Sequence, residues 1–356
     1  MVDSGLINHG WSYINIDDAW QGARGGPFNA IQGNSETFPD IAGLSRYVHG
    51  LGLKLGIYST PWVTSYKKCI GSTCDNENGS YGTNVVKKRG NFSFVKQDVA
   101  QWAAWEIDFL KYDWHPIDVP SAQEMSDALR ACGRDIALSL SSQATFDNAD
   151  SFQKLSQLWR TSADIQATWL SISNTGFMQQ AIWNRFSGPG HWNDPDILQL
   201  GLLNDWKNAG VQIPTGLTAN EQYTQFSLWC LLAAPLIYGG DMTKIDPFTL
   251  SLLTNDEVIA IDQDPLGQAA RRVAKQGRAE VWARDLEDGS KAVGLFNRGE
   301  DPTDVSIDWT ALGLAGNQVA RDLWRQKDLG NFDGIFTTSV PTHGVVLIKL
   351  TPVRQK

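Results

Sequence analysis

Residues 109–113 have the sequence FLKYD, an apolar run that ends in an aspartate and carries a lysine two positions before it. Similar short apolar runs precede and follow this stretch, and longer amphipathic segments separate them. Alternation of strand and helix along a chain predicts a parallel sheet covered by helices. The stretch therefore places this part of the chain in the α/β class.

Seven strands and five helices of this kind are predicted before about residue 270. The strands span residues 13–16, 54–59, 109–113, 136–141, 158–161, 190–193 and 235–240, and the helices span 41–51, 93–105, 122–131, 171–182 and 220–232. This pattern predicts a (β/α)8-type TIM barrel that lacks its first strand. In such barrels the catalytic residues lie at the carboxyl ends of the strands.

The pattern changes near residue 270. Between Arg272 and Leu350, short alternating runs such as AEVWAR and GVVLIKL replace the helical periodicity. Such runs predict an antiparallel β-sandwich. We therefore expect residues 1–270 to form a catalytic barrel domain and residues 271–356 to form a C-terminal β-sandwich domain.

Composition excludes several classes of partner. The formal net charge of −9 argues against nucleic acid and against anionic membrane surfaces. No stretch is long and apolar enough to span a membrane. Cys69 and Cys74 lie in a Gly- and Ser-rich loop, where a short disulfide and two free thiols are both compatible with the sequence. With no CxxC pair and no histidine cluster, no metal site is predicted.

Two aspartates have the placement that glycoside hydrolysis requires of its paired carboxyl groups. Lys111 and Asp113 are two residues apart on one strand and therefore point to the same face. A nearby cation keeps a carboxylate ionised, as a nucleophile must be. Asp164 follows the strand at 158–161 and is the candidate general acid. Retaining enzymes hold the two carboxyls about 5–5.5 Å apart.

Other polar residues at strand ends are candidates for binding a sugar. Asp17 and Asp18 form a pair suited to bidentate hydrogen bonding with adjacent hydroxyls, and Arg160 ends the strand before Asp164. The alternative is that aspartates after strands cap the next helix. Capping does not account for Asp113, which ends an apolar strand and shares a face with Lys111.

Seven blocks in order resemble glycoside hydrolase family 27, the melibiase-type α-galactosidases and α-N-acetylgalactosaminidases. They are YINIDDAW, GLKLGIYS, IDFLKYD, WRTSADI, GPGHWNDPDIL, SLWCLLAAPLIYGGD and EVIAIDQDPLGQ, and the resemblance covers residues 5 to about 270. It implies a barrel followed by a β-sandwich, and hydrolysis of terminal α-D-galactosides by double displacement without a cofactor. It also implies a carbohydrate substrate, while oligomeric state stays open.

The resemblance assigns roles to individual residues. It places the nucleophile at Asp113 and the acid/base at Asp164. Sugar-hydroxyl binding falls on the polar residues at the strand ends, namely Asp17, Asp18, Lys111 and Arg160. It places Asp196 of the WNDPD block near the pocket, and Tyr58 is a further candidate for substrate contact.

Two departures from the family pattern affect these expectations. In the SLSSQA segment, Ser141 and Ala144 stand where bulkier residues favour galactose, so that an N-acetylgalactosamine substrate is an alternative. The family's opening strand is not recognised before Tyr13, and neither is a signal peptide. We expect the full-length protein to be exported, as a secreted, periplasmic or lumenal enzyme.

Three other interpretations remain open on the sequence. The same carboxylates serve related specificities, such as β-L-arabinopyranoside or isomaltose-releasing activity. An inactive sugar-binding protein is a candidate of another class, although both catalytic carboxyls are present. A purely structural barrel would leave several charged residues at one rim without an explanation.

Overall fold

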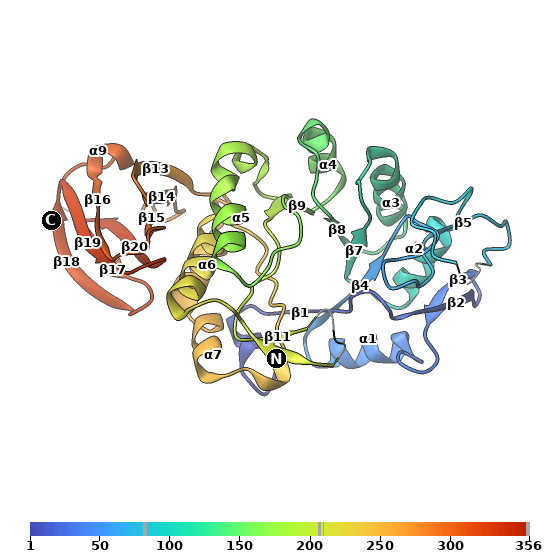
Figure 1. The fold of residues 1–356 in the computed structure, drawn as a ribbon. Coiled ribbons are helices and arrows are strands. Elements are labelled where there is room, and N and C mark those ends of the chain that lie inside the picture. The colour runs from blue at the N-terminus through green and yellow to red at the C-terminus, as the bar shows by residue number, and fades with distance from the viewer. Residues whose placement is uncertain (81–83, 206–207, 209, 354–356) are drawn as a thin grey trace. The chain divides into compact units, whose positions relative to one another are not determined.

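The computed structural model describes residues 1–80, 84–205, 208 and 210–353. The chain divides into two compact units, Met1–Ala163 and Asp164–Lys356, which are described in turn below (Figure 1).

A parallel sheet forms the centre of the first unit. Within this unit the strand order is β1 (Tyr13–Asn15), β4 (Lys54–Ser59), β7 (Phe109–Asp113), β8 (Ala137–Ser141) and β9 (Leu158–Arg160). The bounds of β4 and β7 match the prediction to the residue. Both strands are buried over nearly their full length because both faces of a parallel sheet are covered. Strand β1 pairs with β4 and lies at the edge of the sheet.

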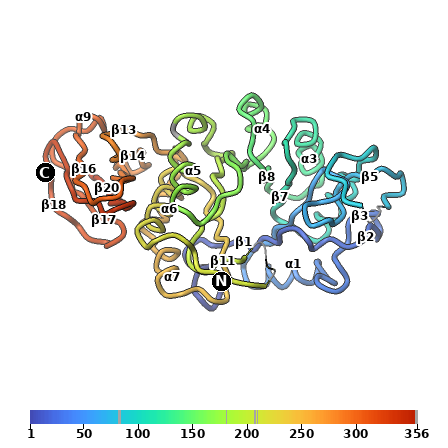
Figure 2. Tube along the Cα trace, in the orientation of Figure 1, coloured from blue at the N-terminus to red at the C-terminus, as the bar shows by residue number. Residues whose placement is uncertain are grey.

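Four helices connect these strands. They are α1 (Ile41–Gly50), α2 (Val95–Ala104), α3 (Val119–Ala131) and α4 (Ala149–Leu155), of which α4 was not predicted. Figure 2 shows the trace passing repeatedly from strand to helix between β1 and α4. The side chains of Asp40 and Asp118 accept hydrogen bonds from the first turns of α1 and α3, as helix caps do. Capping therefore accounts for these two aspartates, whereas Asp113 lies inside β7.

Two small two-stranded sheets in the first unit, of which the first is a hairpin, were not predicted. Strand β2 (Gln21–Gly25) pairs with β3 (Ala30–Gly33), and β5 (Thr73–Cys74) pairs with β6 (Phe92–Ser93). The Arg24 guanidinium fixes the β2–β3 hairpin to α2 through hydrogen bonds of 2.5 and 3.1 Å to the buried Asp98 carboxylate. Polar, glycine-containing strands of this kind lack the apolar alternation by which sequence reasoning recognises a strand.

The helices described in the second unit are α5 (Trp169–Ile182), α6 (Ala219–Leu231), α7 (Pro247–Leu253), α8 (Asp256–Asp262) and the short α9 (Trp309–Leu312). Strand β10 (Trp192–Asp194) lies close to its predicted position, and β11 (Leu202–Asn204) pairs with β12 (Gln212–Pro214). Helices α5 and α6 lie side by side (Figure 1), and α6 also packs against α8.

The prediction of a strand at residues 235–240 is wrong. Only isolated bridges occur there, from Tyr238 to Leu198 and from Gly240 to Leu203. Proline has no backbone N–H to donate and glycine weakens extended structure, and the segment begins with Pro235 and ends in two glycines. The chain is therefore extended at this point without forming a continuous ladder.

The C-terminal part of the second unit is the predicted antiparallel β-sandwich. Six strands form one sheet in the order β13 (Arg271–Gln276), β14 (Ala279–Asp285), β15 (Lys291–Asn297), β20 (Val345–Pro352), β17 (Asn317–Asp322) and β18 (Lys327–Asp333). Strands β16 (Thr303–Asp308) and β19 (Ile335–Val340) form a second, two-stranded sheet. Val293, Val305, Trp309, Phe336 and Ile348 belong to the apolar core that joins the two sheets.

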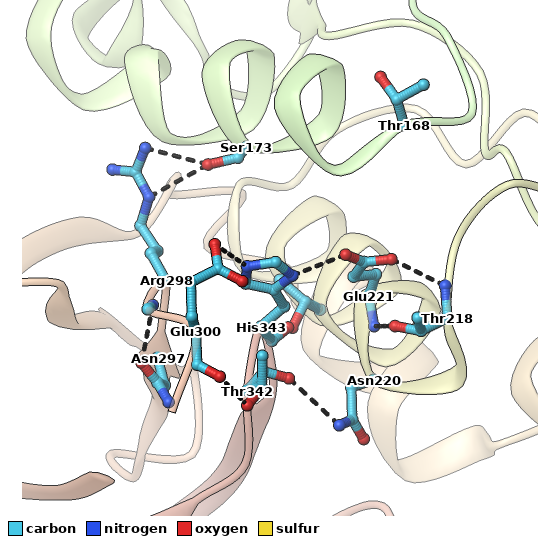
Figure 3. A network of polar contacts seen from close by, with 12 residues as sticks. Thr168, Ser173, Thr218, Asn220, Glu221, Asn297, Arg298, Glu300, Thr342 and His343 are labelled. Carbon is cyan, nitrogen blue, oxygen red and sulfur yellow. Dashed lines mark hydrogen bonds and ion pairs between the residues drawn. The ribbon is translucent and has the colours of Figure 1, made fainter. Parts of the chain in front are cut away.

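A polar network fixes this sandwich to α6 (Figure 3). The His343 ring lies between two carboxylates, with Nδ1 2.7 Å from Glu221 and Nε2 3.3 Å from Glu300. Trp169 stacks on the same ring with a centroid distance of 4.2 Å. Glu221 also completes the capping box of α6 with Thr218. These contacts hold the loop before β20 against the start of α6.

Two further expectations concern cysteines and membranes. The four cysteines are free, so the alternative of two free thiols holds for Cys69 and Cys74, and no disulfide joins them. The Cys74 Sγ atom lies 2.6 Å from the carbonyl oxygen of Ser80. No helix in the part of the chain that the structure describes is long and apolar enough to cross a membrane.

Candidate active site

At the carboxyl ends of the strands in the first unit, several predicted residues lie directly opposite one another on neighbouring strands. Register pairs Tyr58 on β4 with Lys111 on β7, and Asp113 on β7 with Ser141 on β8. Asp113 is 9% exposed and Ser141 is 5% exposed, so both lie at the floor of this edge and not at its outer surface. A parallel sheet thus places residues far apart in sequence at one edge.

Asp113 lies between hydroxyl groups. Ser142 directs its hydroxyl to the Asp113 carboxylate at 3.4 Å, from a backbone in the left-handed region with φ of 71°. Tyr58 is buried. The pKa of Tyr58 is raised far above its usual value. Burial is the largest cause, and the negative charges of Asp113, Asp18 and Asp17 add to it. Tyr58 therefore remains protonated beside these carboxylates.

Asp17 and Lys111 form an ion pair above the sheet. The Lys111 Nζ atom donates to Asp17 Oδ2 at 2.8 Å, although the two residues are far apart in sequence. The surrounding protein would raise the pKa of Asp17, but the Lys111 ammonium outweighs this effect and the pKa is lowered. The sequence predicted Lys111 as a partner for Asp113, whereas this hydrogen bond joins Lys111 to Asp17.

Asp18 fixes the turn after β1 and contacts a distant loop. Its Oδ1 atom accepts from the amide of Ala19 at 2.9 Å and from the side chain of Gln21 at 3.2 Å. Its Oδ2 atom accepts from the backbone amide of Lys67 at 2.8 Å. Ala19 has φ of 95°, a conformation that costs a non-glycine residue free energy and often marks a functional turn. The turn is thus held in place by hydrogen bonds to Asp18.

The ends of β8 and β9 contribute Arg160, Ser141 and Ala144. Arg160 is 5% exposed, and its Nη2 atom donates to the carbonyl of Ser162 at 3.2 Å. The Arg160 carbonyl accepts from the amide of Ala144 at 2.9 Å, which closes the loop after β8 onto β9. Ala144 is buried and small. At this position of the loop after β8, the side chain is therefore no larger than a methyl group.

Asp164 and Asp196 belong to the second unit, where the backbone next to Asp164 is hydrogen-bonded to the Asp196 side chain. Asp164 is exposed, whereas the next residue, Ile165, is buried. The amide of Ile165 donates to Asp196 Oδ2 at 2.8 Å, and the amide of Ile197 donates to Asp196 Oδ1 at 2.8 Å. Asp196 has φ of 85°, and its carbonyl accepts from the Trp229 indole at 2.8 Å. Asp196 therefore supports the backbone that carries Asp164.

Sequence reasoning missed two contributors to this site. Ser142 reaches Asp113 through a left-handed backbone, which no sequence pattern predicts for serine. Lys67 reaches Asp18 through its amide, a contact between segments 49 residues apart in the chain. Among the described residues, no group of three or more His, Cys, Asp and Glu side chains is arranged to hold a metal ion.

Two families match this chain in succession. The family described as alpha galactosidase A matches residues 1–264, and the alpha galactosidase C-terminal beta sandwich domain matches residues 276–350. α-Galactosidase 2 of Arabidopsis thaliana is 35% identical over 358 residues, which cover 99% of this chain and 83% of the relative.

Solved structures agree with these matches. The crystal structure of α-galactosidase I from Mortierella vinacea has a TM-score of 0.83 at 27% identity, covering 98% of this chain and 89% of that chain. A family 27 β-L-arabinopyranosidase from Geobacillus stearothermophilus has a TM-score of 0.84 at 26% identity, covering 100% and 93%. The expected TIM-type α/β domain followed by a C-terminal β-sandwich is thereby confirmed.

Proposed function

Because this chain belongs to glycoside hydrolase family 27, the melibiase-type α-galactosidases, we propose that Asp113 is its nucleophile and Asp164 its general acid/base. The protein is a glycoside hydrolase that removes terminal α-D-galactosyl residues, with the retaining mechanism general to the family. Its substrate is a carbohydrate. The proposal concerns which residues perform this chemistry.

Hydrolysis proceeds in two displacements. In the first, an Asp113 carboxylate oxygen attacks the anomeric carbon, the bond from that carbon to the leaving oxygen breaks, and Asp164 gives its proton to that oxygen. In the second, Asp164 accepts a proton from water while the water oxygen attacks the anomeric carbon and releases Asp113. The galactose product keeps the α configuration because each displacement inverts the centre once.

The observation that carries this proposal is the position of Asp113. It lies at the carboxyl end of a central strand, 9% exposed, with a protonated Tyr58 and the Ser142 hydroxyl beside it. Hydroxyl donors near a carboxylate favour its charged form, which is the nucleophilic one. The polar residues at neighbouring strand ends, Asp17, Asp18, Lys111 and Arg160, are proposed to bind the hydroxyls of the sugar.

The supporting role of Asp196 extends the proposal to the second carboxyl. Both oxygens of Asp196 accept backbone amides, one of them next to Asp164. Asp196 is therefore proposed to hold the acid/base segment and not to contact the reacting atoms. The exposed side chain of Asp164 suits a residue that exchanges protons with substrate and water.

The experiment that tests the function follows the anomeric configuration of the product by NMR. Hydrolysis of 4-nitrophenyl α-D-galactoside is expected to release α-galactose first, with the β anomer appearing later by mutarotation. Release of β-galactose first would overturn double displacement. Binding of galactose without any turnover would support the alternative of an inactive sugar-binding protein.

A second candidate specificity rests on Ser141 and Ala144. Both side chains are small and buried at the end of β8 and in the loop after it. Small residues there leave space for the 2-acetamido group of N-acetylgalactosamine. The test compares kcat/KM for 4-nitrophenyl α-galactoside with that for its 2-acetamido analogue. A strict preference for the galactoside would exclude the acetamido substrate.

We also infer export of the protein, to the medium, the periplasm or an organelle lumen. This inference rests on the family resemblance. Fractionation of the native host, with α-galactosidase activity measured in each compartment, tests it. Activity confined to the cytosol would contradict export.

A further inference from the structure

Two segments of the first unit lie side by side near the turn that carries Asp17 and Asp18. Residues 62–64 and 86–89 are joined by backbone hydrogen bonds of 2.9 Å from Val63 to Lys88 and 3.0 Å from Thr64 to Val86. The first segment continues into a tight turn that bridges Thr64 to Ile70. We call the exposed residues of this structure, Tyr66, Lys67, Lys68, Lys87 and Lys88, the rim platform.

Backbone and charge connect the rim platform to the proposed sugar-binding carboxylates. The Lys67 amide donates to Asp18 Oδ2 at 2.8 Å. Burial raises the pKa of Asp17, but the Lys111 ammonium and, to a lesser extent, the charge of Lys67 lower it. Asp18 in turn acts on a residue next to the platform: the pKa of the Cys69 thiol is raised, first by burial and then by the negative charge of Asp18. The platform therefore borders the carboxylates that would hold the galactosyl ring.

The rim platform carries an unusual excess of positive charge. Residues 60–80 and 84–90 contain four lysines and one arginine against two acidic residues, Asp75 and Glu77, in a chain whose net charge is −9. Arg89 pairs with Glu124 and donates to Ser121 at 3.2 Å. The ammonium groups of the four lysines form no ion pair with any carboxylate among the described residues. Their charge is thus available to a ligand.

The platform also has an aromatic face. Tyr66 is 39% exposed and packs against the buried Trp62 at a centroid distance of 5.2 Å. The Lys87 Nζ atom lies 4.6 Å from the centroid of the Tyr66 ring, within the range of a cation–π contact. This contact holds one of the four charges beside a ring that can pack on the C–H face of a sugar. Aromatic and cationic groups together suit a sugar that carries a negative charge.

We propose that the rim platform is a leaving-group subsite that favours α-galactosides whose leaving sugar carries a carboxylate, such as an aldonate or a uronate. The inference rests on the proposed function, because it assigns the leaving-group side of that same site. The Asp17–Asp18 turn holds the galactosyl ring, Tyr66 packs on the next residue, and Lys67 and Lys87 attract its carboxylate. The carboxylate leaves with the released sugar and takes no part in bond breaking.

The test compares two disaccharide derivatives of equal length. Melibiitol has a neutral open-chain leaving group, and melibionate has the same chain ending in a carboxylate. We expect kcat/KM for melibionate to exceed that for melibiitol by about fivefold at low salt. This factor corresponds to the attraction between two opposite unit charges about 4 Å apart in water. The ratio should fall toward one in 0.5 M NaCl because salt screens exposed charges.

Variants separate the platform from the bulk charge of the protein. Lys67→Gln/Lys87→Gln is expected to bring the melibionate-to-melibiitol ratio close to one at low salt. Lys96→Gln/Lys154→Gln removes the same charge from exposed positions on α2 and α4 and should leave the ratio of the parent protein. Equal kcat/KM values for the two substrates in the parent protein, or an equal fall of the ratio in both double variants, would overturn the inference. Absence of hydrolysis of any α-galactoside would instead overturn the proposed function.

Discussion

The end of β7 and the segment after β9 each present an aspartate, but they hold it in different ways. Asp113 is 9% exposed and is fixed by a strand paired on both sides within its sheet. Asp164 is exposed and lies outside any strand or helix. The first carboxylate ends a paired strand and accepts a hydrogen bond from the Ser142 hydroxyl. The backbone at the second is positioned by the hydrogen bond that its neighbour Ile165 donates to Asp196.

This difference matches the two tasks of a retaining glycosidase. A nucleophile must stay ionised and keep its distance to the anomeric carbon, which a strand end and nearby hydroxyl donors favour. An acid/base residue must gain and lose a proton in each cycle, which requires access to water. The two environments therefore support different roles for two residues of the same type, and the following experiments test that distinction.

The largest effect is expected for Asp113→Asn. An amide cannot form the covalent intermediate, so kcat should fall by at least about 10⁴-fold for every substrate, whatever its leaving group. Steady-state rates with nitrophenyl galactoside and melibiose measure this. The matched control is Asp118→Asn, five residues further on at the N-cap of α3. Asparagine also caps helices, so stability should change by less than about 1 kcal/mol and activity should be retained. A similar loss of activity in both variants would contradict the assignment.

Asp164→Asn should give a smaller loss that depends on the leaving group. Loss of general acid catalysis is expected to lower kcat/KM by about 10²–10⁴-fold for melibiose. An activated nitrophenyl leaving group needs less protonation and should lose much less. A series of aryl galactosides with different leaving-group pKa values measures the slope. Equal losses across the series would overturn the role of Asp164.

Asp196→Ala tests whether the acid/base segment needs its buried support. Removing the acceptor leaves the Ile165 amide unsatisfied, and we expect kcat/KM for melibiose to fall by about 10–100-fold. The loss should resemble that of Asp164→Asn in its dependence on the leaving group. Asp196→Asn keeps one acceptor oxygen and tolerates the left-handed backbone, so it should recover part of the loss. A loss independent of the leaving group would assign Asp196 to another role.

Asp17→Asn tests the binding side of the first unit. Because Lys111 lowers the pKa of Asp17, the carboxylate stays ionised as pH falls to its ordinary value near 3.8, and the contribution of the pair is lost only below it. The substitution should therefore raise KM by about five- to tenfold, and by the same factor from pH 7 down to pH 5. A factor that shrinks between pH 7 and pH 5 would show that Asp17 titrates in this range.

The smallest catalytic effect is expected for Asp262, a buried carboxylate in α8 that does not lie at a strand end. Burial raises its pKa to about 7, although Gln263 and Arg284 oppose this. Between the unfolded-state value of about 3.9 and 7, the folded protein binds more protons, so stability falls as pH rises through that window. Asp262→Asn should be up to about 3 kcal/mol more stable than the parent at pH 8, with little change at pH 4.

Thermal unfolding at the two pH values measures this difference, and kcat for Asp262→Asn should stay within about twofold of the parent. A large fall in kcat would mean that burial of a carboxylate, and not its position at a strand end, determines function here.

How far the sequence predicts this molecule depends on the range of the interactions. Strands β4 and β7 were predicted to the residue because each has a short apolar run that ends in a polar residue, as buried parallel strands with a polar carboxyl end do. The strand expected at 235–240 consists of isolated bridges, and the β2–β3 hairpin was missed because its residues are polar. The residues at the strand ends, such as Asp113, could be predicted from the pattern of strands along the chain. The Lys111–Asp17 and Lys67–Asp18 contacts do not, because they join segments that only the folded chain brings together.

The most direct test of the central claim is to trap the covalent intermediate. A fluorinated α-galactosyl fluoride should inactivate the enzyme. Fluorine near the anomeric centre slows both displacements, and the good fluoride leaving group speeds only the first, so that the covalent intermediate accumulates. After trypsin digestion, mass spectrometry should find the sugar on the peptide from Tyr112 to Arg130, esterified to Asp113. A sugar attached to any other residue, or an active enzyme that forms no adduct, would contradict Asp113 as the nucleophile.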